Sequence, residues 1–241
     1  MNHAIIDCRM SLQCKKSLKI LGYNLIEVCE NPNLDKPISA HPDISVFCYK
    51  NIILTEANLK QSLTEQMFKE GERSYTVMEG CKFENKTSYP FDCTLNFALC
   101  GNKLIGNNKI ISTALFDLAV REKFEIIHVN QGYAKCNICT VSENAIITED
   151  KGIANTCKTN GIDVLLLNNN FVKLSGYKYG FIGGATGTVF DIKNGNKILF
   201  CGCIEKHPEY NLIKNFCKSH GAELISLSDD DLYDYGSIII I

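Results

Sequence analysis

The sequence predicts an α/β fold in which five ββαβ units close into a five-bladed propeller with pseudo-fivefold symmetry. Three observations support this prediction. A strand–helix–strand pattern recurs five times along the 241 residues, a glycine follows the helix in four copies, and a further apolar strand precedes four copies. The fifth such strand stands at the other end of the chain. We therefore expect one domain over residues 1–241.

The five copies share one order of features. Each opens with a short apolar strand, passes through a polar connection, continues with apolar residues at helical spacing and finishes with a second apolar strand. The copies run over residues 2–28, 51–77, 102–129, 144–167 and 196–227. Leu59, Leu63 and Met67 illustrate the helical spacing in the second copy. This pattern predicts one helix between two strands in every unit.

A glycine follows the predicted helix in four units, at Gly22, Gly71, Gly161 and Gly221. Glycine tolerates the left-handed backbone conformation that commonly ends a helix, so these residues mark helix C-termini. The third unit has Lys123 at this position. We expect its helix to end in a different way.

A further apolar strand is predicted before each unit but the first. These strands are "ISVFC" (44–48), "CTLNFAL" (93–99), "NICTV" (137–141) and "TGTVF" (186–190). The copy missing before the first unit stands at the end of the chain as "GSIIII" (236–241). A closed ring explains this displacement, because the C-terminal strand then pairs with the first unit. A generic three-layer α/β protein also alternates strands with helices, but the repeated order favours the ring.

The composition bears on partners and location. The formal net charge is −2 and the basic residues form no long run, so neither nucleic acid nor a membrane is an expected partner. No apolar stretch approaches the length of a membrane span, and the N-terminus does not read as a secretory signal. With thirteen cysteines and no export signal, we expect a cytoplasmic protein whose thiols are mostly free core residues. We expect no cofactor.

Five ββαβ units in a ring resemble the pentein fold, the α/β-propeller of the guanidino-group-modifying enzymes. Arginine deiminases, amidinotransferases and dimethylarginine hydrolases have this fold, as does a ribosome-binding initiation factor without catalytic activity. The chain is also similar to a small uncharacterised bacterial family in this superfamily. The resemblance extends over essentially the whole chain through the repeats, and it implies a site at the central channel.

The junctions that lead into the first strands would lie at the mouth of this channel. They read "SAHPDIS", "YPFDCT", "GYAKCNIC", "FIGGATG" and "LYDYGS". His41-Pro42-Asp43 resembles the His-Leu-Asp element of the guanidino-modifying enzymes, which implies that His41 is a general acid/base and that Asp43 holds a guanidinium. Lys135-Cys136 resembles the element that carries the nucleophile, two units after the histidine. The resemblance therefore implies Cys136 as the nucleophile.

The chemistry of these side chains supports the implied roles, although each residue also has a structural interpretation. A lysine beside Cys136 would depress the pKa of the thiol, and Asp43, Asp92 and Asp234 are candidates to pair with a cationic substrate. "HPD" is also a common turn sequence. Cys93, at an equivalent junction, is the next candidate nucleophile after Cys136.

The junction "IGGATG" contains Gly183 and Gly184, which we assign to substrate binding. It resembles a Glu-Gly-Gly-Asp element of the relatives but lacks both acids, so these glycines can also serve close backbone packing. Cys136 and Cys139 form a lone C-x-x-C on a predicted strand, where residues three apart point to opposite faces. We therefore expect no metal there. The carboxylate run 229–231 is expected to be a solvated loop.

Two functions remain open from the sequence. The first is a cysteine-dependent hydrolase or transferase acting on a small amidine or guanidine. The second is a non-catalytic pentein that binds a macromolecule, with structural residues in its channel. The missing acids at 183–185 favour the second function or a different substrate. The sequence does not define the oligomeric state.

Overall fold

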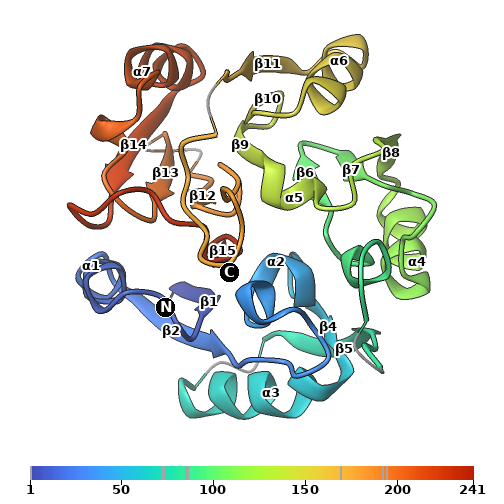
Figure 1. The fold of residues 1–241 in the computed structure, drawn as a ribbon. Helices are drawn as coiled ribbons and strands as arrows, with labels where there is room; N and C mark the ends of the chain where they lie inside the picture. The colour runs from blue at the N-terminus through green and yellow to red at the C-terminus, as the bar shows by residue number, and fades with distance from the viewer. Residues whose placement is uncertain (1, 72–73, 85–86, 169, 192, 194) are drawn as a thin grey trace.

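The structure, a computed structural model, describes residues 2–71, 74–84, 87–168, 170–191, 193 and 195–241. Five three-stranded sheets surround a central axis as blades, with one longer helix per blade on the outside (Figure 1). In every blade the innermost strand is antiparallel to the middle strand, which is parallel to the outermost strand. The predicted five-bladed ring of ββαβ units is confirmed.

The blades follow the chain order of the five predicted units. For each blade we give the innermost, middle and outermost strands first and then the outer helix, which lies between the middle and outermost strands in the chain. In that order, the first has β15 (Ile239–Ile240), β1 (Asn2–Asp7), β2 (Tyr23–Val28) and α1 (Leu12–Ile20); the second has β3 (Val46–Tyr49), β4 (Ile52–Glu56), β5 (Thr76–Cys81) and α3 (Lys60–Lys69). The third has β6 (Ala98–Cys100), β7 (Lys103–Gly106), β8 (Glu125–His128) and α4 (Thr113–Glu122). The fourth has β9 (Ile138–Ser142), β10 (Ala145–Thr148), β11 (Asp163–Leu166) and α6 (Lys151–Thr159); the fifth has β12 (Thr186–Val189), β13 (Asn196–Phe200), β14 (Ala222–Ser226) and α7 (Tyr210–Ser219).

The C-terminal strand closes the ring by pairing with the N-terminal blade, as predicted. Ala4 pairs with Ile240 and Ile5 with Ile239 in antiparallel register. Beyond this pair, the backbone N–H groups of His3 and Ile241 each donate to the other residue's carbonyl, at 2.9 and 3.0 Å. The first blade therefore takes its innermost strand from the opposite end of the chain.

The core lies between the blades, with each outer helix packed against the preceding blade. Between the fourth and fifth blades, Ile213 and Cys217 of α7 pack with Val141 of β9 and Ile147 of β10. Between the third and fourth, Ile153 of α6 packs with residues of β6 and β7. Three further clusters fill the other blade boundaries. An apolar stripe on each helix therefore joins neighbouring units.

The helix ends confirm the glycine prediction and correct it for the third unit. Gly22, Gly71, Gly161 and Gly221 all have positive φ. Lys123 has the same left-handed conformation (φ 58°), and its N–H donates to the carbonyls of Ala119 and Val120. The expectation of a different ending is therefore wrong, because the helix keeps its backbone geometry without glycine.

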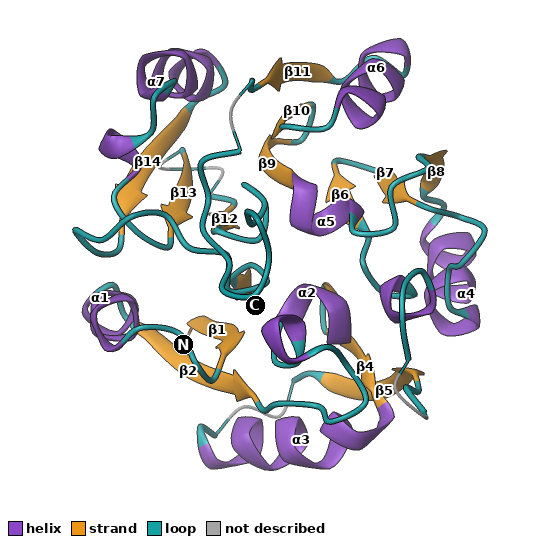
Figure 2. Cartoon of the chain, in the orientation of Figure 1, coloured by secondary structure: helices purple, strands orange, loops and turns teal. Residues whose placement is uncertain are grey.

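Several innermost strands are shorter than predicted, because their first residues form helical turns. These turns are α2 (Pro42–Ser45) before β3, the 3-10 turn η3 (Phe91–Cys93) in the segment that leads to β6, and α5 (Ala134–Asn137) before β9. Proline is favoured in the first turn of a helix, which accounts for the start of α2 at Pro42. Figure 2 shows α2 and α5 close to the centre of the ring. None of the helices in the described part of the chain has the length and apolar character needed to cross a membrane.

Candidate active site

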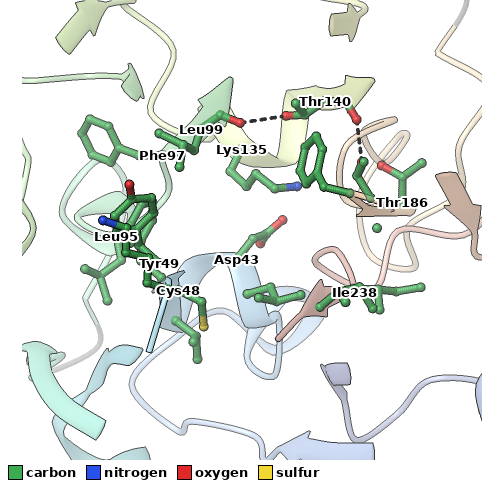
Figure 3. A pocket seen from close by; sticks show the side chains of 18 of the residues that line it. Asp43, Cys48, Tyr49, Leu95, Phe97, Leu99, Lys135, Thr140, Thr186 and Ile238 are labelled. Atoms are coloured by element: carbon green, nitrogen blue, oxygen red, sulfur yellow. Dashed lines mark hydrogen bonds between the residues drawn. The ribbon is translucent and has the colours of Figure 1, made fainter. Parts of the chain in front are cut away.

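Two cavities adjoin the helical turns at the centre of the ring. The first is the central channel, a space of about 370 Å³ lined by the innermost strands together with Asp43 and Lys135. Figure 3 shows the side chains of Asp43 and Lys135 pointing toward the middle of this channel. The second cavity, of about 360 Å³, contains Cys136, His41 and Asp234 in its wall. We call this second space the thiol cavity.

Apolar and aromatic side chains form most of the remaining wall of the thiol cavity. They come from α2 and the segment before it, from the turn before α5 and from the long connection between β11 and β12. These residues are Ile38, Ile44, Tyr133, Leu174, Tyr177, Tyr179 and Phe181, with Lys178 as an exposed cation among them. A mostly apolar cavity with a few convergent polar groups is the usual form of a small-molecule site.

Cys136 is held by Asn96, a residue that the sequence did not single out. The Asn96 side-chain amide donates to the Cys136 sulfur (3.2 Å) and to the carbonyl of Asp43 (2.9 Å). Its oxygen accepts from the backbone N–H groups of Lys135 (2.7 Å) and Cys136 (3.3 Å). One buried side chain therefore connects the junctions that carry Asp43 and Cys136. A polar residue inside the apolar stretch "TLNFAL" was the signal that could have identified it.

The Cys136 thiol is protonated in the free protein. Only 3% of the residue is exposed, and burial raises its pKa well above the ordinary range, with the Asp43 and Asp234 carboxylates adding to the effect. A further interaction with the Asp43 side chain acts in the same direction, and the Asn96 amide opposes it. A positive charge close to the sulfur would lower this pKa.

The prediction that Lys135 depresses the pKa of Cys136 is wrong. The Lys135 ammonium group extends into the channel and donates to the Ser237 hydroxyl at 2.9 Å. Successive residues in a turn direct their side chains to different sides, so neighbours in sequence need not interact. The charge of Lys135 instead lowers the pKa of Asp43, against a larger opposite effect of burial.

His41 lies at the start of α2 with its ring in the wall of the thiol cavity. The residue is 1% exposed, and burial lowers its pKa to about 3, with the nearby positive charge of Arg9 contributing. Its Nδ1 atom has no hydrogen-bond partner and lies 3.8 Å from the nearest carboxylate oxygen of Asp234. That separation is too long for a hydrogen bond, so the ring is neutral and not paired as a cation.

Asp43 and Asp234 are buried carboxyl groups that differ in their hydrogen bonding. Ser237 donates to one oxygen of Asp43 at 2.7 Å, whereas burial raises the pKa of this acid. Asp234 accepts from the backbone N–H groups of Phe181 and Gly236, both at 2.9 Å. Burial, followed by repulsion from Asp43, raises the pKa of Asp234 to about 7. A cation close to the two carboxyl groups would therefore stabilise their ionised forms.

Asp92 is buried beside the thiol cavity and is not part of its wall. Its carboxylate accepts from the Tyr133 hydroxyl (2.7 Å) and from the Cys93 thiol (3.1 Å). Tyr133 separates it from the cavity, so its substrate-binding role stays a prediction. Cys93 is likewise absent from the cavity wall, and burial raises the pKa of its thiol.

Gly183 and Gly184 lie behind the site and allow close packing. A Cβ on Gly183 would collide with the carbonyl oxygens of Lys135, Cys136 and Ile138, and one on Gly184 would collide with the Asp234 carboxylate. The Gly184 N–H donates to the Cys136 carbonyl at 2.8 Å. These contacts fix the positions of Cys136 and Asp234, while contact of either glycine with a substrate stays a prediction.

The two cysteines of the lone C-x-x-C lie in different elements. Cys136 lies in α5 and Cys139 in β9, and both thiols are buried and free. Within the described residues, no cluster of three or more histidine, cysteine or acidic side chains is arranged to hold a metal ion.

Comparisons with known proteins support the fold. The model of a family of unknown function, DUF6873, matches residues 5–239. No curated protein matches the chain. Solved structures match through shape, at low sequence identity.

The chain is similar to three solved structures over nearly its full length. DDAH from Pseudomonas aeruginosa, a cysteine-to-serine mutant in complex with citrulline, has a TM-score of 0.53 at 10% identity, covering 94% of this chain and 92% of that one. C. jejuni agmatine deiminase, a cysteine-to-serine variant with substrate bound, has 0.52 at 12%, covering 97% and 91%. SxtG, an amidinotransferase from Microseira wollei, has 0.51 at 11%, covering 94% and 88%. The TM-scores and the coverage show a shared fold, and the chain has the pentein fold.

Proposed function

We propose that this chain, which belongs to the DUF6873 family of unknown function, is a cysteine-dependent hydrolase or transferase acting on a small amidine or guanidine. The observation that carries the proposal is the convergence of three polar groups on the thiol cavity. Cys136, His41 and Asp234 come from three different junctions and line the same space. The fold neighbours, an agmatine deiminase, an amidinotransferase and DDAH, are consistent with this chemistry.

Charge is the basis for selecting a cationic substrate. Asp43 and Asp234 have raised pKa values because each is buried, and Asp43 repels the negative charge of Asp234. A guanidinium or amidinium beside them would stabilise both carboxylates and the Cys136 thiolate at once. Two charges 4 Å apart interact by about 4 kcal/mol at the effective dielectric constant near a protein surface, enough to lower a thiol pKa substantially. The substrate itself would therefore activate the nucleophile.

The reaction follows from the positions of the side chains. The Cys136 thiol passes its proton to Asp43, whose carboxylate is near enough to raise the pKa of the thiol, and the thiolate forms a C–S bond with the amidine carbon. The C–N bond then breaks, and the nitrogen leaves as an amine with the proton that Asp43 took from the thiol, relayed through His41. Water, in a hydrolase, or a second amine, in a transferase, attacks the same carbon while His41 accepts its proton. The C–S bond breaks, and His41 passes this proton to the released thiolate. Cys136 is regenerated.

The alternative is a non-catalytic pentein that binds a macromolecule. It is favoured by the junction "IGGATG", which keeps the paired glycines but has Ile182 and Ala185 where the family resemblance implies acids. The close packing of Gly183 and Gly184 gives these residues a structural role that does not depend on catalysis. The two functions can be distinguished by whether Cys136 reacts faster with a cationic thiol reagent than with a neutral one.

A matched pair of thiol reagents tests the proposal. 2-Chloroacetamidine is a cation, whereas 2-chloroacetamide is neutral and of nearly the same shape. We expect Cys136 to be alkylated at least about tenfold faster by the amidine at pH 7.5, after correction for the reactivity of each reagent with a free thiol, since about 1.4 kcal/mol of charge stabilisation gives a factor of ten. Peptide mass spectrometry identifies the modified cysteine.

Variants make the result specific. Asp234→Asn should remove most of the preference for the cation, and Cys93→Ser should leave it unchanged. Equal rates for both reagents at Cys136, or a preference that survives in Asp234→Asn, would refute the amidine site. Release of amine from a panel of guanidines, lost in Cys136→Ser and His41→Asn, would then identify the substrate.

A further inference from the structure

Cys8 and Cys29 directly follow the ends of two neighbouring strands of the first blade, outside the thiol cavity. β1 and β2 are parallel, and the register pairs Asp7 with Val28. The N–H of Cys8 donates to the Val28 carbonyl at 3.1 Å, which is the last bond of this ladder. Cys8 and Cys29 directly follow the last paired residues, and they are close enough for Cys29 to raise the pKa of the Cys8 thiol. Neighbouring strands are about 4.8 Å apart, within the range of about 4.4–6.8 Å between the Cα atoms of a disulfide.

This pair differs from the other cysteines in exposure. Cys29 is exposed and Cys8 is half-buried, whereas eight of the thirteen cysteines are buried and the other three are half-buried. All thirteen lie in the described part of the chain and are free thiols. Reactivity with reagents in solution requires access, so the pair is open to chemistry that most of the other thiols are not.

We propose that Cys8 and Cys29 are a redox-active pair that forms a disulfide by exchange with a small-molecule disulfide such as oxidised glutathione. The exposed Cys29 thiolate attacks one sulfur of glutathione disulfide and releases one glutathione thiol. Cys8 then attacks the Cys29 sulfur and releases the second glutathione. Two protein thiols are oxidised and one glutathione disulfide is reduced, with the two thiol protons transferred to the glutathione released.

The surroundings support this order of attack. Burial and the adjacent Asp7 carboxylate raise the pKa of Cys8, which lowers the fraction of this half-buried thiol that is ionised. Arg9 opposes this shift from the next position in the chain. The exposed partner therefore reacts first, and proximity then drives the second step.

The disulfide would form beside the approach to the candidate active site. Arg9 follows Cys8, Glu30 follows Cys29, and the two side chains approach each other to 3.5 Å. Both line a third cavity, of about 530 Å³, whose wall also includes His41 and Asp234. Oxidation would therefore fix the two chain segments at one side of this space. The proposal does not depend on the function of Cys136.

The test is disulfide mapping of the native protein. The full chain is equilibrated with reduced and oxidised glutathione at a series of ratios, quenched with acid, alkylated and digested. We expect a cross-linked peptide containing Cys8 and Cys29, an intact mass lower by two hydrogens and the loss of two alkylatable thiols. The midpoint of the series gives the reduction potential of the pair.

Single variants separate the two steps. In Cys8→Ser, Cys29 should stop at the mixed disulfide with glutathione, because the resolving thiol is gone. Cys203→Ser, which removes a half-buried thiol elsewhere, should form the cross-link as the wild type does. If wild-type Cys29 also stops at the glutathione adduct, or if both thiols stay reduced at every ratio, the proposal is wrong.

Discussion

At the scale of single residues, the candidate active site is a concentration of buried polar groups with incomplete hydrogen bonding. One carboxylate oxygen of Asp43 and the Nδ1 atom of His41 are both buried without a partner. Leaving such a group unsatisfied costs about 1–3 kcal/mol. These unsatisfied groups lie close to Cys136 and Asp234, at the thiol cavity. Unpaired buried polar groups of this kind are often found at functional sites.

His41 provides a test of this burial through pH. The pKa of His41 is about 3 in the folded protein, against 6.5 for an ordinary histidine, so below pH 6.5 the unfolded chain binds the proton more tightly. Stability contributed by the neutral ring is present above pH 6.5 and is lost as the pH falls toward 3. Between pH 7 and pH 4.5, wild type should lose about 2–3 kcal/mol more unfolding free energy than His41→Asn.

Urea unfolding at the two pH values measures this difference. Asp234 and Glu149, whose pKa values burial raises to about 7, contribute with the opposite sign. Both are present in either protein, and because Asp234 lies 3.8 Å from His41, the comparison reports His41 together with its effect on Asp234. Equal pH dependence in wild type and His41→Asn would mean that the ring is not held neutral.

At the scale of elements, each blade is a ββαβ unit whose helix must end before the outermost strand begins. Four of the five helices meet this requirement with a glycine in the left-handed conformation. The fifth, α4, does so with Lys123 at φ 58°. The left-handed conformation costs a residue with a side chain about 1 kcal/mol, so this helix end lowers the stability of the protein by about that amount.

Replacing this residue tests the cost directly. Lys123→Gly should stabilise the protein by about 0.5–1 kcal/mol in thermal or urea unfolding, because glycine adopts the native conformation without strain. Gly161→Ala is the matched reverse change, since Gly161 has φ 74° and open space around its Cα. It should destabilise by about 1 kcal/mol. Destabilisation by Lys123→Gly would show that other interactions of the lysine outweigh its backbone strain.

At the scale of the whole molecule, the ring is closed through non-covalent contacts between the two ends of the chain. β15 pairs with β1, and partly buried Ile239 and Ile241 pack against the cluster that joins the first and second blades. His3 and Ile241 complete the pairing through two backbone hydrogen bonds. Removing the strand would expose the edge of β1 and open one of the five inter-blade cores.

Deletion of residues 239–241 should therefore lower the unfolding free energy by about 3 kcal/mol or more, from the apolar burial and hydrogen bonds that are lost. A circular permutant provides the control. Its ends 2 and 241 are joined by a short glycine linker and new ends are opened between Asn108 and Lys109, at an exposed turn. It should unfold cooperatively with nearly wild-type stability. A deletion that costs less than about 1 kcal/mol would show that the ring does not depend on this closure.

The repeating units could be predicted because their signals are local. Helical spacing, the glycines after the helices and the displaced strand "GSIIII" are all readable along the chain, and the structure confirms the ring. The short turns α2 and α5 were missed because each has only four residues, too few to show helical spacing of apolar residues. Asn96 was missed because its importance depends on hydrogen bonds to Lys135 and Cys136, about forty positions away.

The candidate site likewise depends partly on signals in the sequence and partly on contacts in the folded protein. The sequence identified Cys136, His41 and Asp234 as separate residues of three junctions, and only the folded ring places them in the wall of one cavity. The effect expected from Lys135 was not found, because side-chain direction and burial determine a thiol pKa, and neither is a property of neighbouring letters. Periodicity along the chain thus determined the number and order of the blades. Contacts between residues distant in sequence, together with exclusion of water, decided the electrostatics of the site.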